Sequence, residues 1–176
     1  MFDYFIPDII FQNVYDIDFK ALKEKNNIKG IIFDIDNTLV SYKQEKPTKS
    51  VCELMDELTG EGFFICFVSN NNKKRVDIFN EKFKYFSIPK AGKPFTGCIK
   101  KALKAMKISK ENAVIIGDQL FTDIAAAKRA KIMAILVDPI EPVETLFFKL
   151  KRFMEKPFIK RYYKKNNMNM YFGEQK

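Results

Sequence analysis

Residues 30–36 read Gly-Ile-Ile-Phe-Asp-Ile-Asp, a short apolar run that ends in two carboxylates. This pattern is typical of a strand that is buried on both faces and opens to solvent at its carboxyl end. Three later segments repeat it, and each closes on polar residues: 63–69, 113–118 and 132–138. The sequence therefore predicts four buried strands, which suit the interior of a parallel sheet.

Helical patterns lie between these strands. Pro47 suits the first position of one helix and Pro94 that of a second, while residues 73–84 and 121–131 predict two more. A short fifth strand is expected around residues 85–89. Because strands and helices alternate, we expect an α/β fold with a doubly wound parallel sheet in three layers.

The composition excludes several classes of site. With 176 residues, of which 47% are hydrophobic, the chain suits one domain with its own core. The absence of histidine excludes Ser-His and Cys-His nucleophilic sites and histidine-bound zinc or haem. Cys52, Cys66 and Cys98 lack a Cys-x-x-Cys pairing and stand among apolar residues, so we expect buried thiols in a reducing compartment. Without a basic leader or an apolar run long enough to cross a bilayer, the protein is expected to be cytoplasmic.

The basic excess gathers near the C-terminus. The net charge is +9, and residues 148–165 alone hold eight basic groups and one acid. One interpretation is a helix that packs an apolar stripe on the sheet; the stripe is Val143, Leu146, Phe147, Leu150 and Met154. The other is a break at Pro157 followed by a segment that binds an anionic surface through aromatic, apolar and basic groups. The aromatic and apolar groups of that segment are Phe158, Ile159, Tyr162 and Tyr163. An RNA backbone would suit the same pattern.

Polar residues follow each predicted strand. In a doubly wound sheet the carboxyl ends of the strands border one ligand crevice. The candidates for this crevice are Asp34, Asp36, Ser69, Asn70 and Asp118, with Asp123 close behind and Lys93 on a turn before a helix. Clustered carboxylates without histidine or cysteine select Mg²⁺. A strand-end aspartate can attack phosphorus, and a second acid two residues later can protonate the leaving oxygen and then activate water.

Four segments resemble, in order, the four motifs of the haloacid dehalogenase-like (HAD) phosphatase superfamily. They are Asp34-Ile35-Asp36-Asn37-Thr38-Leu39-Val40, Ser69-Asn70, Lys93-Pro94, and Gly117-Asp118 with Asp123. The resemblance covers roughly residues 30–138.

The resemblance implies a role for each motif residue. Asp34 would be the nucleophile and Asp36 the general acid/base. Ser69 would bind a phosphoryl oxygen, with Asn70 beside it in the substrate site, and Lys93 would neutralise developing charge. Mg²⁺ would bind Asp34, the Asp36 carbonyl and Asp118, with Asp123 as a further ligand or as a residue that orients the ligands.

Longer segments are similar to the YqeG-type branch of HAD subclass IIIA. They read Ile-Lys-Gly-Ile-Ile-Phe-Asp-Ile-Asp-Asn-Thr-Leu-Val (28–40), Ala-Gly-Lys-Pro (91–94) and Ile-Gly-Asp-Gln-Leu-Phe-Thr-Asp-Ile (116–124). This branch includes enzymes that convert phosphatidylglycerophosphate to phosphatidylglycerol, which implies the same reaction here. A phosphatase for a soluble metabolite, a nucleic-acid end or a phosphoprotein is an alternative, and a non-catalytic, basic RNA-binding module is an alternative of another class.

The motif spacing leaves no room for a lid domain. Asp36 and Ser69 are 33 positions apart, and Ser69 and Lys93 are 24 apart, so the site is expected to be open to a phosphate carried by a large body. We divide the chain into an N-terminal apolar and aromatic segment with an entry helix (1–29), a catalytic domain (30–140), and a C-terminal helix with a basic tail (141–176).

The resemblance implies an anionic phospholipid headgroup as the substrate. The basic tail predicts a contact with the inner face of an anionic membrane, rather than with nucleic acid. The sequence leaves open the oligomeric state and the role of the N-terminal segment.

Overall fold

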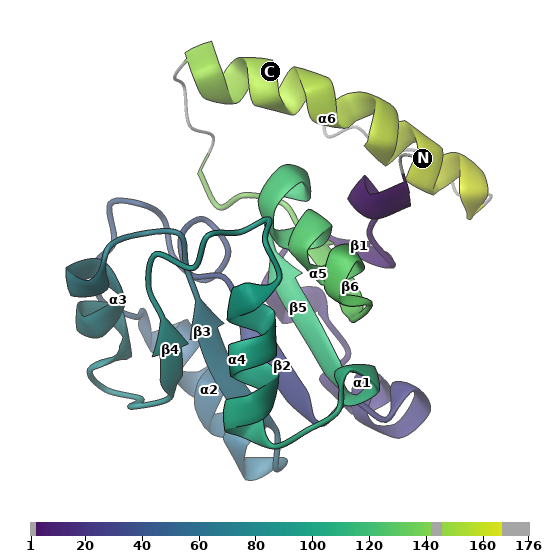
Figure 1. Cartoon of the computed structure of the whole chain (residues 1–176). Helices are drawn as coiled ribbons and strands as arrows, with labels where there is room; N and C mark the ends of the chain where they lie inside the picture. Colours follow the sequence, from purple (N-terminus) through teal and green to yellow (C-terminus); the bar gives the residue numbers. More distant parts are fainter. Residues whose placement is uncertain (1–2, 142–145, 167–176) are drawn as a thin grey trace.

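The fold is a single parallel sheet of six strands in the order β1-β6-β5-β2-β3-β4 (Figure 1). The computed structural model describes residues 3–141 and 146–166. The strands are β1 (Ile9–Phe11), β2 (Gly30–Phe33), β3 (Phe64–Val68), β4 (Phe86–Ile88), β5 (Ala113–Gly117) and β6 (Met133–Val137). The chain runs outward from β2 to β4 and then returns to β5 on the other side of β2. The predicted doubly wound sheet is confirmed. Its crevice lies at the carboxyl ends of β2 and β5, two paired strands from which the chain continues to opposite sides of the sheet.

The predicted strands are all present, including the short fifth one, which is β4. The sequence missed β1, which pairs with β6 at the edge of the sheet, with Ile10 opposite Leu136. Three residues are too few to show an alternation of apolar and polar side chains. The expected apolar N-terminal segment thus supplies an edge strand of the same sheet.

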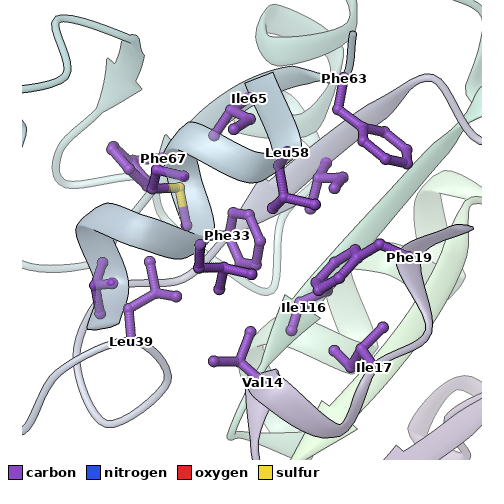
Figure 2. Packing of buried hydrophobic residues seen from close by; sticks show 14 of the residues in the cluster. Val14, Ile17, Phe19, Phe33, Leu39, Leu58, Phe63, Ile65, Phe67 and Ile116 are labelled. Atoms are coloured by element: carbon purple, nitrogen blue, oxygen red, sulfur yellow. The ribbon is translucent and has the colours of Figure 1, made fainter. Parts of the chain in front are cut away.

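Helices cover both faces of the sheet, which confirms three layers. The bounds are α1 (Phe19–Asn26), α2 (Lys49–Gly60), α3 (Lys73–Asn80), α4 (Gly97–Met106), α5 (Ala125–Ala130) and α6 (Leu146–Lys165), with short turns η1 (Asp3–Phe5), η2 (Val14–Asp16), η3 (Lys110–Asn112) and η4 (Leu120–Ile124). Phe33 and Phe67 pack with α1, α2 and α3 in one core (Figure 2), and their strand neighbours Ile32 and Val68 pack with α4 and α5 in the other. The three cysteines are free and buried, as predicted.

The helix starts differ from those predicted. Helix α2 begins at Lys49, where the Thr48 side chain accepts a hydrogen bond from the Val51 amide at 3.3 Å, and not at Pro47. Helix α4 begins at Gly97, after a cis Lys93–Pro94 peptide bond, so Pro94 belongs to the preceding turn. The helix predicted over 121–131 begins instead as the π-helical turn η4 and continues as α5. Such π turns are frequent at functional sites.

The predicted helix break at Pro157 is wrong, because α6 continues through this proline to Lys165. The helix lies across the end of the sheet toward which the strand arrows point (Figure 1). Glu155 of α6 is fully buried and accepts a hydrogen bond from the Leu120 amide of η4 at 3.3 Å. Ring contacts of Phe158 with Phe121 and Phe5, at 5.9 and 5.1 Å between centroids, hold the same face.

The orientation of α6 corrects both interpretations of the C-terminal segment. Leu150 and Met154, expected on the sheet, are exposed, while the other residues of that stripe lie outside the described side chains. The aromatic and apolar groups expected to face an anionic surface are buried or half-buried instead; they are Phe158, Ile159, Tyr162 and Tyr163. The basic groups expected to face it are exposed; they are Lys160, Arg161, Lys164 and Lys165. The sequence pattern does not determine which side of α6 packs on the protein, because apolar groups occur around most of the circumference of the helix.

Candidate active site

A pocket of about 280 Å³ lies at the carboxyl ends of the central strands. Its lining includes six of the seven residues predicted for the crevice: Asp34, Asp36, Ser69, Asn70, Lys93 and Asp123. The seventh, Asp118, lies in the same carboxylate cluster as Asp34 and Asp123. The structure therefore brings all seven to one end of the sheet.

Backbone hydrogen bonds place these side chains. The Asp34 amide donates to the Ile116 carbonyl of β5 at 2.9 Å, which continues the β2–β5 pairing past the end of β2. Asn70, after β3, binds the backbone of Lys93 twice, with its Oδ1 2.9 Å from the Lys93 amide and its Nδ2 3.0 Å from the Lys93 carbonyl. The lysine turn is thus fastened to the end of β3, which directs Lys93 toward Asp34.

Lys93 is the buried cation at the centre of the site. Its Nζ lies 2.6 Å from Asp34 Oδ1 and 2.7 Å from Asp123 Oδ1, and it donates to the Val68 carbonyl at 2.8 Å. Burial lowers the pKa of Lys93, but the charges of Asp123 and Asp34 outweigh it and raise the pKa above its usual range. The lysine is therefore charged at neutral pH and holds two carboxylates together.

Three buried carboxylates form a group that fits one metal ion. Oxygens of Asp34, Asp118 and Asp123 all lie within 4.8 Å of one another. Oxygen ligands that share one Mg²⁺ at about 2.1 Å stand roughly 3 to 4 Å apart, so small shifts would bring these three to one ion. The Asp36 carboxylate lies outside this group; the resemblance had assigned its carbonyl to the metal.

Acidic side chains outnumber basic ones among the described buried residues of the site. Four of these residues are aspartates, Asp34, Asp36, Asp118 and Asp123, and two are cations, Lys93 and Arg75. Burial raises the pKa of Asp34 to about 7, Lys93 opposes this rise, and the charges of Asp123 and Asp36 add to it. A divalent cation beside Asp34 would favour the ionised form of this carboxyl.

Sequence reasoning missed Arg75, in the first turn of α3. Its Nε and Nη2 lie 3.0 and 2.9 Å from Asp36 Oδ1. Ser69 Oγ and Asn71 Nδ2 donate to Asp36 Oδ2, at 3.3 and 3.2 Å. The sequence feature that could have singled out Arg75 is the rarity of arginine in this chain. Nearly all of the 31 basic residues are lysine, and Arg75 is one of four arginines.

The rim of the pocket holds further residues that the sequence analysis did not select: Tyr42, Asn71, Gln119 and Thr122. Gln119 Nε2 donates to the Tyr42 hydroxyl at 3.4 Å. Burial, and then the charges of Asp118, Asp34 and Asp36, raise the pKa of Tyr42 to about 12. The phenol is therefore neutral at neutral pH and can donate a hydrogen bond to a phosphate oxygen. No feature of the sequence marks Tyr42 as a site residue, since tyrosine is common in loops.

We expect Gly117→Ala to distort the carboxylate group. A Cβ at this position would lie 2.5 Å from Asp123 Cγ, so the side chain of Asp123 would have to move. Overpacking of this kind costs about 1–3 kcal/mol of unfolding free energy, and we expect activity to fall at least about tenfold. Urea denaturation and p-nitrophenyl phosphate hydrolysis measure both effects. Gly97→Ala is the matched control, because its Cβ would meet nothing within 4 Å; equal behaviour of the two variants would contradict the prediction.

Comparisons with known proteins agree with this geometry. Residues 90–139 match the HAD-hydrolase-like family. The chain is 37% identical, over 153 residues, to the probable phosphatase YqeG of Bacillus subtilis (strain 168), and the match covers 87% of this chain and 88% of that protein.

Solved structures show the same fold at low sequence identity. NagD from Escherichia coli K-12 superposes with a TM-score of 0.53 at 15% identity, covering 68% of this chain and 90% of that one. An uncharacterized protein from Listeria monocytogenes serotype 4b gives 0.53 at 19% identity, covering 68% and 86%. With the identity to YqeG over most of both chains, these findings show that the chain belongs to the HAD phosphatases of the YqeG type, a group of phosphomonoester hydrolases.

Proposed function

We propose that this phosphatase removes the phosphate of phosphatidylglycerophosphate at a membrane surface, with Mg²⁺ as cofactor and an aspartyl-phosphate intermediate. The observation that carries the metal and the mechanism is the group of three buried carboxylates, Asp34, Asp118 and Asp123, whose oxygens lie within 4.8 Å of one another at the end of β2. Asp34, Asp118 and Asp123 would hold the ion, together with the Asp36 carbonyl. When bound, Mg²⁺ supplies positive charge that lets an anionic phosphate approach these carboxylates.

The residues of the chain perform two displacements. Asp34 attacks phosphorus, and the bond from phosphorus to the ester oxygen breaks as Asp36 gives that oxygen a proton. Asp36 then takes a proton from water, which attacks the aspartyl-phosphate and releases Asp34 and inorganic phosphate. Lys93 and Ser69 bind phosphoryl oxygens and stabilise the charge that develops on them.

The open site suits a phosphate on a large body. Only α2 and β3 separate Asp36 from Ser69, and only α3 and β4 separate Ser69 from Lys93. The described part of the chain thus places no additional domain over the pocket. A lipid headgroup at a bilayer surface would itself exclude water from such a site.

The solvent face of α6 supports a membrane surface as the partner. Leu150, Phe153 and Met154 are 58, 68 and 53% exposed and lie within about one turn of each other. The exposed residues of the later turns are basic: Lys160, Arg161, Lys164 and Lys165. An apolar patch followed by basic groups is the pattern of a helix that lies in the interface of an anionic bilayer.

The position of α6 relative to the pocket also favours this partner. The helix packs on η4, which carries Asp123, so a membrane under α6 would lie near the phosphate site. None of the helices in the described ranges has the length and apolar character that crossing a bilayer requires.

The decisive experiment is phosphate release from phosphatidylglycerophosphate in mixed micelles, with Mg²⁺ or with EDTA, beside a panel of soluble phosphomonoesters. We expect Mg²⁺-dependent release that is selective for the lipid. Release from the soluble panel alone would keep the phosphatase and discard the lipid substrate. Full release in EDTA would discard the metal.

We expect the double substitution Phe153→Ser with Met154→Ser to weaken binding to anionic vesicles about tenfold or more, since each buried apolar side chain contributes about 1.5–3 kcal/mol. Co-sedimentation with phosphatidylglycerol vesicles measures this. These changes leave the packed face of α6 intact, whereas truncation at residue 157 would remove Phe158 from its aromatic contacts.

Two controls complete this test. Hydrolysis of a soluble phosphomonoester should stay within about twofold, because the patch is outside the pocket. Lys100→Glu with Lys104→Glu changes exposed charges of α4 and should reduce binding far less than Lys160→Glu with Lys164→Glu. Equal losses from the two pairs would mean that general basic charge, and not this helix, attracts the vesicle.

A further inference from the structure

We propose that Arg75 is the positioning residue of the general acid/base: it fixes the carboxylate of Asp36 and fastens the loop over residues 41–47 to it. This inference rests on the role of Asp36 in the proposed function. It concerns a residue that none of the four motifs contains.

The guanidinium of Arg75 connects two parts of the site. Nε and Nη2 bind Asp36 Oδ1, and two further hydrogen bonds of the guanidinium reach the loop. Nη1 donates to the Glu45 carbonyl at 2.6 Å, and Nη2 donates to the Gln44 carbonyl at 2.8 Å. Arg75 is only 8% exposed, so these bonds form away from bulk water, where they are strongest.

Arg75 is itself held in one place. Asn72 caps α3 and accepts a hydrogen bond from the Arg75 amide at 2.9 Å. The guanidinium carbon lies 5.9 Å from the centre of the Phe79 ring, one turn further along the helix. Because the guanidinium is planar and its side chain is held on a capped helix, Arg75 can fix the position of the carboxylate that it binds.

The pattern of donors assigns different tasks to the two oxygens of Asp36. Oδ1 accepts from Arg75, whereas Oδ2 accepts from Ser69 and Asn71. The Ser69 hydroxyl is also the donor assigned to the phosphoryl group, so substrate binding would draw it away from Oδ2. This leaves Oδ2 as the oxygen that carries the proton to the leaving group, while Arg75 keeps Oδ1 in place.

A lysine could not replace this arginine. One ammonium on a flexible chain cannot match the geometry of two carbonyls and a carboxylate at once. Arg75→Lys therefore keeps the charge and removes the orientation, which separates positioning from simple charge balance.

A double-mutant cycle tests the proposal with p-nitrophenyl phosphate, whose hydrolysis does not depend on the lipid assignment. We expect Asp36→Asn to lower kcat about 10²–10⁴-fold and Arg75→Met about 10²-fold, and KM to fall as well, because the slowed step follows formation of the covalent intermediate. Because Arg75 acts through Asp36, adding Arg75→Met to Asp36→Asn should cost less than about threefold more. Arg75→Lys should lose at least about tenfold.

The burst of p-nitrophenol released before the steady state provides a second test of the proposal. The p-nitrophenolate group leaves without a proton, but hydrolysis of the aspartyl-phosphate still needs Asp36 as base. Arg75→Met should therefore release one equivalent of p-nitrophenol rapidly and then turn over slowly. A variant that is merely less folded would show a smaller burst and no change in the rate per active molecule.

Lys74→Met is the matched control, since it removes an exposed charge next to Arg75 and should keep kcat within about twofold. The proposal is overturned if Arg75→Lys is fully active, or if the losses of Asp36→Asn and Arg75→Met multiply. Should Arg75→Met fail to fold, Arg75→Lys with and without Asp36→Asn repeats the cycle. Full activity of Asp36→Asn would instead overturn the acid–base assignment in the proposed function.

Discussion

Asp34→Asn is expected to abolish turnover, with kcat lowered by at least about 10⁴-fold, while the sheet stays folded. The amide cannot attack phosphorus, and no other described carboxylate occupies the end of β2. The backbone amide at position 34 donates to β5 whichever side chain the residue carries, so the order of the strands should not change. Steady-state hydrolysis of p-nitrophenyl phosphate and far-ultraviolet circular dichroism measure the two outcomes.

The covalent intermediate gives a sharper test of the same residue. Rapid acid quench of the wild-type protein with labelled substrate should trap a phosphoryl group that hydroxylamine removes, as expected for an acyl phosphate. Asp34→Asn should trap none. Asp56→Asn, an exposed aspartate of α2, is the control and should behave as wild type. Retained activity or retained label in Asp34→Asn would eliminate this residue as the nucleophile.

The parts of the fold that the sequence predicted are those with strong local patterns. Strands such as β2 and β5 are buried on both faces, so nearly every residue is apolar and the end is marked by a carboxylate. The edge strand β1 has three half-buried residues and no such mark, and it is defined only by its partner β6. The phase of α6 likewise depends on what it packs against, here η4 and η1, which no pattern within α6 records.

The site residues likewise fall into those that local sequence patterns predict and those that only the fold reveals. Asp34, Lys93 and Asp118 stand at fixed places relative to strand ends and turns, so the topology alone brings them together. Arg75 reaches Asp36 across 39 positions of sequence from the first turn of a helix, and its importance follows from burial and geometry. The strand pattern read over residues 30–36 gives a strand that ends at Phe33, before either carboxylate. Asp34 and Asp36 have different partners, Lys93 and Arg75, which that pattern does not record.

Lys93→Met is expected to have the second largest effect, and on two properties at once. Removal of this ammonium leaves the carboxylates of Asp34 and Asp123 buried without the cation that now lies within 2.7 Å of both. Loss of one partner of a buried ion pair costs about 3–5 kcal/mol of unfolding free energy. We therefore expect a clear fall in the urea midpoint in EDTA, with an unchanged denaturant slope.

Mg²⁺ should separate the structural role of Lys93 from its role in turnover. An ion bound by Asp34, Asp118 and Asp123 would neutralise the same carboxylates and, by binding only the folded protein, recover much of the lost stability. Activity should stay at least about 10²-fold below wild type even at saturating Mg²⁺, because the ion does not replace the donor to the phosphoryl oxygens.

The comparison protein is Lys100→Met, which removes an exposed lysine of α4 and should change neither property by much. If Lys93→Met were as stable as wild type in EDTA, the two carboxylates would have to be neutral or solvated without the lysine, and Lys93 would not be the group that holds them together. If Lys93→Met were less stable than wild type in EDTA but fully active with Mg²⁺, Lys93 would contribute only to the stability of the metal-free protein.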